Sequence, residues 1–259
     1  MRFASLGSGS RGNATLIQAG STCLLLDCGF SVRELEKRCE RLQLDTGQID
    51  AVLVTHEHAD HVKGLGALAR KCGMTVWMTH GTWRNLRCGD IPDLQLFGSH
   101  TSDFAIGDIR VTPYPVPHDA REPVQYTFSF QQNRIGILTD AGSITPHLVA
   151  TLDGVDALMV ECNHDMDMLR NGPYPPRLQA RVGGDYGHLS NQQAAQLLSM
   201  IDLSLLQYLV IGHISEKNNT PELALGAVLE HASDLENRIT MLKQDGGSGW
   251  FQLETSMTD

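Results

Sequence analysis

Residues 51–61 read AVLVTHEHADH, and this stretch decides the expected fold. The apolar run at its start predicts a short buried strand. Four metal-competent side chains then follow within six residues. His56 and His58 are two residues apart, so an extended chain points them the same way, whereas Asp60 and His61 lie where a helix is expected to begin. One short segment can therefore reach two adjacent metal ions, which a surface loop with chance histidines would not explain.

The same arrangement recurs further along the chain. Apolar, strand-like stretches end at or just before a ligand-type side chain, namely His118, Asp140, His164 or His213. A lone histidine after a strand is more often a satisfied polar group than a ligand. Several at equivalent places are harder to explain in that way, because each buried imidazole or carboxylate would need its own partner. A shared metal centre would satisfy them together.

The composition is that of an ordinary globular protein, with 259 residues, 41% hydrophobic and 19% charged, and we expect one domain spanning residues 1–259. A formal charge of −10 argues against a broad basic face for nucleic acid but allows a local phosphate site. The six cysteines form no CxxC pair, which favours reduced thiols in a cytoplasmic protein. No apolar run reaches the roughly 18 residues that span a bilayer, so no membrane segment is expected.

Amphipathic spacing and capping residues predict four helices, over residues 31–42, 62–71, 190–200 and 220–233. Short strands are expected between them, most densely over residues 104–139. Sheets in the middle with helices outside are the natural layering for this order of elements.

The HxHxDH motif at residues 56–61, the later His118, the TDAG segment around Asp140 and the GH pair ending at His213 together resemble the metallo-β-lactamase-fold hydrolases. Residues 25–29, LLDCG, match the first motif of that superfamily, so the resemblance covers nearly the whole chain. More narrowly, the chain resembles the YycJ/WalJ-type branch, which is related to the PhnP-type cyclic phosphodiesterases. The segments that carry this narrower resemblance are GSGSRGN at 7–13, ECNHD at 161–165, GHLSN at 187–191 and GHIS at 212–215.

The resemblance implies an αββα sandwich of the metallo-β-lactamase type, with two mixed sheets, helices outside and the site at one edge. It also implies two divalent metal ions per chain. The implied ligands are His56, His58 and His118 for the first ion and Asp60, His61 and His213 for the second, with Asp140 bridging them and Asp27 behind as an orienting carboxylate. A plain turn residue is the alternative for Asp27. The imidazole and carboxylate donors suit zinc and would also accept manganese.

Two such ions, roughly 3.5–4 Å apart, can share a hydroxide that is available near neutral pH and polarise a phosphoryl or carbonyl oxygen. The resemblance therefore implies hydrolysis by attack of a metal-bridging hydroxide, with Asp60 and His188 as catalytic residues. His188 stands just before a capped helix, where it is interpreted as a phosphate donor or proton shuttle. A loop histidine that packs against the helix start is the alternative.

Further candidates for substrate contact are Ser10, Asn13, His164, Arg177 and Arg181. The two arginines belong to a Gly- and Pro-rich stretch, residues 170–181, which is either an arm that grips backbone phosphates or a solvated loop. Ser10 and Asn13 lie in a turn that would face the metal edge, and a plain β-turn is the alternative. His164 is interpreted as a substrate contact or as an outer partner of the site.

The favoured function is a phosphodiesterase acting on nucleic acid, because the YycJ/WalJ branch is associated with nuclease activity on DNA from a 5′ end. A DNA or RNA end, held locally, is the expected partner. The PhnP-like relatives instead hydrolyse small cyclic phosphates, and a thioester or lactone hydrolase would use nearly the same ligands, so both stay open. A non-catalytic binding module is disfavoured, because structural metal sites are closed by fewer protein ligands, usually with cysteines. The sequence predicts no oligomeric state.

Overall fold

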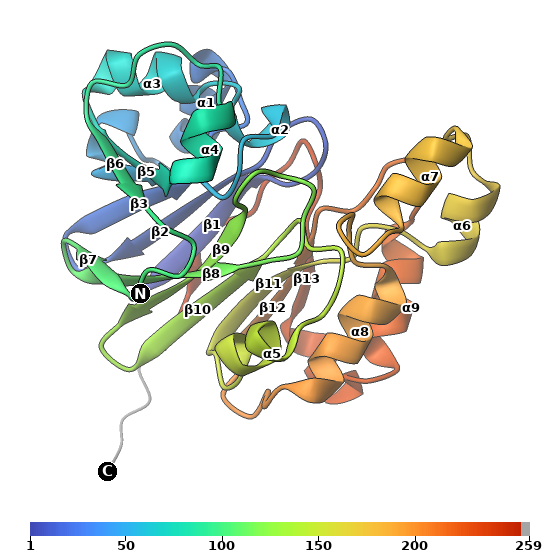
Figure 1. The fold of residues 1–259 in the computed structure, drawn as a ribbon. Helices are drawn as coiled ribbons and strands as arrows, with labels where there is room; N and C mark the ends of the chain where they lie inside the picture. The colour runs from blue at the N-terminus through green and yellow to red at the C-terminus, as the bar shows by residue number, and fades with distance from the viewer. Residues whose placement is uncertain (255–259) are drawn as a thin grey trace.

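The computed structural model describes residues 1–254, which form two seven-stranded sheets (Figure 1). The first sheet has the order β14-β1-β2-β3-β4-β5-β6. Its strands are β1 (Arg2–Gly7), β2 (Ala14–Ala19), β3 (Thr22–Leu26), β4 (Ala51–Leu53), β5 (Thr75–Thr79), β6 (Leu94–Phe97) and β14 (Phe251–Gln252). β1 to β3 are antiparallel, and β3 to β6 run parallel to one another.

The second sheet has the order β13-β12-β11-β10-β9-β8-β7. Its strands are β7 (Phe104–Ile106), β8 (Ile109–Pro115), β9 (Val124–Phe130), β10 (Asn133–Leu138), β11 (Ala157–Glu161), β12 (Tyr208–Gly212) and β13 (Ile239–Met241). β7 to β10 form an antiparallel meander, and β10 to β13 are parallel. Both sheets are therefore mixed, and each has a run of parallel strands whose carboxyl ends meet at one edge.

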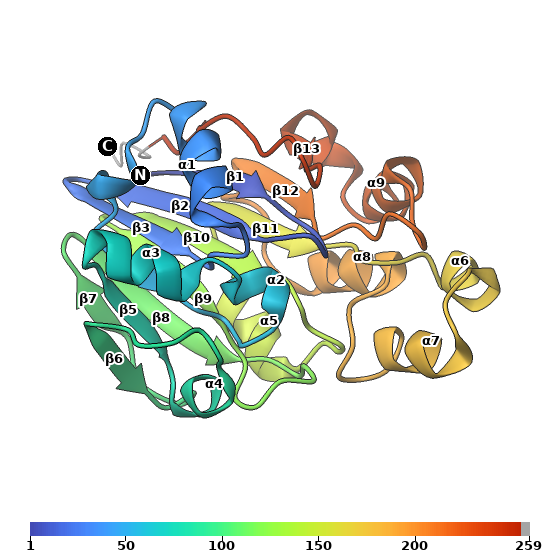
Figure 2. The ribbon, with the colours of Figure 1, turned by 90° about the horizontal axis from the view of Figure 1, so that it is seen from above.

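Figure 2 shows the layers of the molecule, and three apolar clusters of the described residues lie between them. The middle cluster joins the inner faces of the two sheets through side chains such as Phe3, Leu24, Tyr126 and Ile137. The other two lie between each sheet and the helices on its outer face. This is the predicted αββα arrangement, and it follows from apolar residues on both faces of the central strands.

The helices fall into three groups. On the first sheet lie α1 (Val32–Glu40), α2 (Ala59–Val62), α3 (Leu65–Cys72) and α4 (His80–Asn85), and on the second lie α5 (Pro146–Leu152), α8 (Asn191–Met200) and α9 (Pro221–Leu229). The third group, α6 (Met166–Asn171) and α7 (Pro176–Val182), stands apart from both sheets (Figures 1 and 2). Two 3-10 turns complete the helical elements, at Thr46–Gln48 and Ser233–Arg238.

Capping side chains account for the helix starts that the sequence predicted. Ser31 accepts a hydrogen bond from the backbone of Glu34, and Ser190 forms a capping box at the start of α8. The helix expected over residues 62–71 is instead split into α2 and α3. Gly64 lies at the break, where a β-carbon would come within 2.0 Å of the Phe30 carbonyl oxygen. Close backbone packing explains why a glycine occupies this break.

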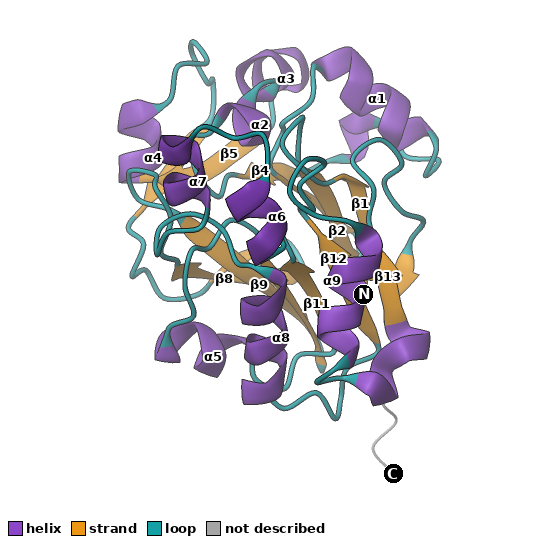
Figure 3. Cartoon of the chain, turned by 90° about the vertical axis from the view of Figure 1, so that its right-hand side faces the viewer, coloured by secondary structure: helices purple, strands orange, loops and turns teal. Residues whose placement is uncertain are grey.

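Residues 165–187, which we call the α6–α7 segment, lie in front of the strand ends when the molecule is viewed from this side (Figure 3). No helix was predicted here, nor at α4 or α5. Each of these helices has only six or seven residues, too few for a periodic apolar pattern, and begins at a local signal such as the Asp165 cap or Pro176.

Among residues 1–254, no helix has both the length and the apolar character needed to cross a lipid bilayer.

Candidate active site

The candidate site lies where the parallel strands of both sheets end. His56 and His58 follow β4, while Asp140 and His213 follow β10 and β12. Asp27, Asp140 and His213 have positive φ angles of 60°, 58° and 51°. This conformation is uncommon outside glycine and is concentrated at functional sites. The tight left-handed turn after each strand directs the next side chain toward the shared edge.

Three histidines form the first candidate ligand cluster. The ligand atoms of His56, His58 and His118 all lie within 4.8 Å of one another. His118 Nδ1 is 2.9 Å from the Gly187 carbonyl oxygen, which leaves Nε2 facing His58 Nδ1 at 3.2 Å. His56 Nδ1 contacts the Thr55 hydroxyl at 3.0 Å. In each case the outer nitrogen is fixed by the protein and the inner one is presented to the cluster.

Asp140 stands between two further groups of ligand-type side chains. One oxygen is 3.2 Å from His61 Nε2, and the other is 3.5 Å from His213 Nε2 and 3.6 Å from His188 Nδ1. Burial alone would raise the pKa of Asp140, but the imidazoles of His213 and His61 outweigh it and hold that pKa well below its usual range. A carboxylate that stays charged between two clusters suits the bridging position predicted for it.

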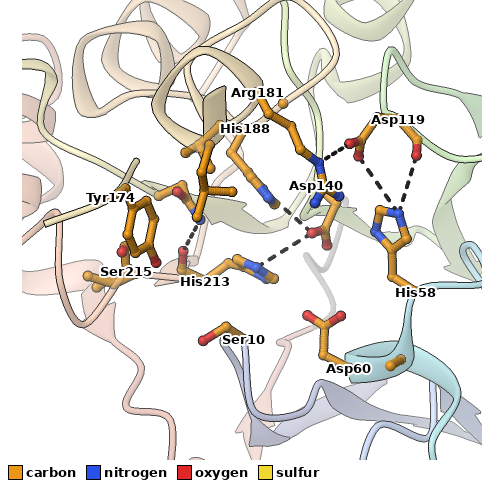
Figure 4. A pocket seen from close by; sticks show the side chains of 16 residues that line it. Ser10, His58, Asp60, Asp119, Asp140, Tyr174, Arg181, His188, His213 and Ser215 are labelled. Carbon is orange, nitrogen blue, oxygen red and sulfur yellow. Dashed lines mark hydrogen bonds and ion pairs between the residues drawn. The ribbon is translucent and has the colours of Figure 1, made fainter. Parts of the chain in front are cut away.

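Asp60 and His61 approach the site from α2. Asp60 Oδ2 is 3.6 Å from His61 Nε2, and both side chains lie close to the Asn13 amide nitrogen, at 3.3 and 3.1 Å. Figure 4 shows Asp60 on the opposite side of the pocket from Arg181. Asn13 thus contacts the ligand-bearing segment but is not among the pocket-lining residues, whereas Ser10 and Asp60 are.

Asp27 lies behind the site, as predicted for a carboxylate that orients a ligand. Its Oδ2 is 2.8 Å from His61 Nδ1, and its Oδ1 accepts the Thr55 backbone N–H at 2.9 Å. Burial opposes the charged form of His61, but Asp140 and Asp27 outweigh it and raise the His61 pKa well above its usual value. The contacts of Asp27 with Nδ1 and of Asp140 with Nε2 therefore fix the orientation of the His61 ring.

His188 is held by a buried acid that the sequence analysis did not single out. Its Nδ1 lies 3.0 Å from Glu161 Oε2, and the other oxygen of Glu161 accepts the Ala141 backbone N–H at 2.6 Å. Burial lowers the pKa of His188, but the carboxylates of Glu161 and Asp140 outweigh it and raise that pKa to about 9. The two carboxylates therefore favour the protonated form of His188, which is the form that a proton donor needs.

The unpaired atoms of the site test whether a metal ion fits. Within residues 1–254, the buried atoms without a hydrogen-bond partner include His56 Nε2, Asp140 Oδ2 and His213 Nδ1. Orphaned polar atoms at these positions are costly unless a cation or water satisfies them. In the part of the chain that the structure describes, three groups of side chains have metal-ligand spacing: His56, His58 and His118; His56, His61 and Asp140; and Asp140, His188 and His213. The donor set thus fits divalent ions, and it admits His188 as a ligand as well as an acid.

The pocket in front of this cluster has a volume of about 330 Å³. Its polar side carries His58, Asp60, Asp119, Asp140, His188 and His213. Arg181 reaches it from α7 and pairs with Asp119, whose other oxygen lies 3.7 Å from His58 Nε2 (Figure 4). A cation thus stands at the rim of an otherwise acidic pocket.

The residues predicted to contact substrate differ in whether they line the pocket. Ser10 and Arg181 line the pocket, but Arg177 is exposed on α7 and is absent from the lining. His164 is fully buried beside Ser190 and is not among the pocket-lining residues, a position that favours its alternative role as an outer partner of the site. Its neighbour Asn163 lines the pocket instead. Glu161, Asp119 and Asn163 were missed, although each adjoins a motif residue.

Comparison with known proteins agrees with this geometry. The family model described as "Beta-lactamase superfamily domain" matches residues 22–214. The chain is 35% identical over 227 residues to a Bacillus anthracis protein named exodeoxyribonuclease YycJ, with 86% of each chain covered. It is 32% identical over 231 residues to exodeoxyribonuclease WalJ of Streptococcus pneumoniae, covering 86% of this chain and 85% of that protein.

Among solved structures, a protein described as a new diphosphatase from the PhnP family superposes with a TM-score of 0.67 and 18% identity, covering 98% of both chains. That likeness supports the fold. The matched family model shows the superfamily, and the relatives above 30% identity show the YycJ/WalJ branch. The chain belongs to the β-lactamase superfamily and is a metallo-β-lactamase-fold, metal-dependent hydrolase with YycJ/WalJ-type relatives.

Proposed function

We propose that the protein is a phosphodiesterase that removes nucleotides from a 5′ end of nucleic acid. The observation that carries this proposal is the position of His188, whose Nδ1 lies 3.0 Å from Glu161 Oε2 and which lines the same pocket as the ligand cluster and Arg181. The alkoxide that leaves a phosphodiester needs a proton, whereas the thiolate that leaves a thioester does not. The names of the 35% and 32% identical relatives support the same substrate class.

We propose two divalent ions, zinc or manganese, held by His56, His58, His118, Asp60, His61, His213 and the bridging Asp140. When bound, they would supply a hydroxide nucleophile near neutral pH and neutralise charge on the phosphoryl oxygens. Asp60 would orient the attacking water by accepting its hydrogen bond. His188 would donate its proton to the leaving oxygen as the P–O bond breaks, and Glu161 would hold its ring in position.

Substrate binding would be local, since the net charge of −10 gives no broad attraction for a polyanion. Arg181 lines the pocket and would contact a phosphate oxygen in place of Asp119. Ser10, Ser215 and Asn163 supply neutral hydrogen-bonding groups on the same wall.

Protein freed of metal with EDTA and then loaded with zinc or manganese would test the proposal. We expect hydrolysis of a 5′-phosphorylated oligonucleotide that depends on added metal, with two metal equivalents per chain by elemental analysis. Full activity at one equivalent would contradict the binuclear mechanism. Faster hydrolysis of a 2′,3′-cyclic nucleotide would favour the small cyclic phosphodiesterase, and turnover of a thioester alone would overturn the phosphodiesterase.

A further inference from the structure

The candidate pocket has a second wall that carries no ligand-type side chain. Tyr174, Leu178 and Val182 from the α6–α7 segment line it, together with Ile214 from the loop after β12. All four residues are partly buried, so some of their surface remains open to solvent. Leu178 and Val182 are four residues apart on α7 and therefore share one face of that helix. Figure 4 shows Tyr174 at the end of the pocket away from His58.

The backbone around Tyr174 is built to hold its ring in place. Pro173 precedes it and Pro175 follows it, and α7 begins at Pro176. Proline fixes its own φ angle and restricts the residue before it, so little backbone freedom remains to be lost on binding. Lys217 Nζ lies 5.8 Å from the centre of the Tyr174 ring, which adds a cation near its face. An aromatic ring carried by such a restricted backbone at the pocket is a suitable platform for another flat ring.

We infer that Tyr174, Leu178, Val182 and Ile214 form a subsite for the nucleobase next to the scissile phosphate. The inference rests on the proposed phosphodiesterase function and adds a preference for esters that carry a base. A base has an apolar face and a polar edge, which match this wall and the neighbouring Ser10, Ser215 and Asn163. Stacking on an aromatic side chain accepts every base, so the subsite would bind nucleotides with little sequence preference. The volume of about 330 Å³ lies at the lower end of the roughly 300–1,000 Å³ of ligand pockets, in keeping with one nucleotide unit.

A pair of esters with the same leaving group isolates the contribution of the base. We would compare thymidine 5′-(p-nitrophenyl phosphate) with methyl p-nitrophenyl phosphate on the metal-loaded protein. We expect the wild type to have a KM about tenfold lower for the thymidine ester, from the size of base–aromatic stacking. Tyr174→Ala should raise that KM about tenfold and leave the methyl ester unchanged, whereas Tyr174→Phe should keep the preference because it keeps the ring.

Tyr186→Ala is the matched control, because Tyr186 is in the same segment, is 64% exposed and is not among the pocket-lining residues. It should leave both esters unchanged. Equal effects of Tyr174→Ala on the two esters, or no effect on either, would overturn the subsite.

Calorimetric binding of thymidine 5′-monophosphate and of inorganic phosphate separates this inference from the proposed function. We expect about tenfold tighter binding of the nucleotide, lost in Tyr174→Ala, and this readout needs no turnover. Tighter binding of the nucleotide without hydrolysis of either ester would retain the subsite and reject the phosphodiesterase. Hydrolysis of both esters with equal binding of nucleotide and phosphate would reject the subsite alone.

Discussion

The two walls of the pocket are built in opposite ways. The ligand wall is formed by side chains at and near strand ends, where the buried carboxylates of Asp27 and Glu161 hold the imidazoles of His61 and His188. The other wall comes mainly from the α6–α7 segment, whose helices have six and seven residues and whose side chains are mostly exposed or half-buried. A site for metal ions needs fixed geometry, whereas a site for a variable substrate needs only a suitable surface. The effects of substitutions on the two walls should therefore differ in kind as well as in size.

The largest effect is expected from Asp140→Asn on the ligand wall. Asparagine tolerates the left-handed backbone at this position, so the change removes the charge and keeps the shape. Three histidines would lose their shared counter-charge, and we expect a loss of activity on the order of 10⁴-fold or more, as when one member of a catalytic unit is removed. Elemental analysis should show the loss of at least one metal equivalent. Wild-type turnover would remove Asp140 from the ligand set.

His188→Gln should have the next largest effect. A lost general acid lowers turnover by about 10²–10⁴-fold, and the loss should be smaller for a p-nitrophenyl ester, whose leaving group needs less protonation. Metal content decides between the two roles that the geometry permits. Unchanged metal with reduced turnover on DNA supports the acid, whereas loss of one metal equivalent makes His188 a ligand.

Asp27→Asn tests the layer behind the ligands. Its carboxylate contacts His61 and not the pocket, so we expect metal affinity to fall by about 10–100-fold with little change in turnover at saturating metal. Asp50→Asn is the control, because the Asp50 carboxylate accepts a backbone N–H of the same sheet, at Cys23, away from the site. Equal metal affinity in wild type and Asp27→Asn would make Asp27 a plain turn residue.

The ligand wall could be predicted from sequence because its signal is local. An apolar run followed by a ligand-type side chain marks a strand end, and this pattern located His118, Asp140 and His213 correctly at the edge of the second sheet. Glu161 was not predicted as a site residue because it is the last residue of a buried strand and was therefore assigned to the strand. Its partner His188 is also 27 residues away in the sequence. The same pattern marked His164 as a site residue, since sequence does not say which side of a strand end faces the pocket.

The substrate wall could not be predicted, because its residues converge only through the short helices. Arg177 and Arg181 were equivalent in the sequence, being four residues apart in a Gly- and Pro-rich stretch. Their difference in exposure to the pocket depends on how α7 is docked against the strand ends, which no local pattern specifies.

Arg181→Ala and Arg177→Ala measure that difference. Arg181 is half-exposed and already paired with Asp119, so its loss should raise KM for an oligonucleotide by only roughly two- to fivefold. The salt dependence of binding should weaken by about one phosphate contact. Arg177→Ala should leave KM unchanged. Equal effects of the two substitutions would mean that the segment acts through its general charge.

His164→Leu should have no effect on turnover, and its effect on stability should depend on pH. His164 is fully buried, and within residues 1–254 neither ring nitrogen has a hydrogen-bond partner. Burial lowers its pKa to about 4, below the roughly 6.5 of an unfolded histidine. Between these values the unfolded chain binds a proton that the folded protein does not, so folding stability is lost as the pH falls from 6.5 toward 4.

Leucine cannot bind that proton, so the wild type should lose stability relative to His164→Leu as the pH is lowered. Thermal melting of both metal-loaded proteins between pH 7.5 and pH 5 would measure this effect. The Tm of the wild type minus the Tm of the variant should decrease as the pH is lowered. His231→Gln, at an exposed position, controls for the removal of a histidine as such. A constant difference in Tm would show that His164 is not the buried titrating group. A fall in turnover at neutral pH would instead show that His164 takes part in the active site. Its side chain would then have to be grouped with the histidines that follow strands and face the pocket, and not with buried residues of the core.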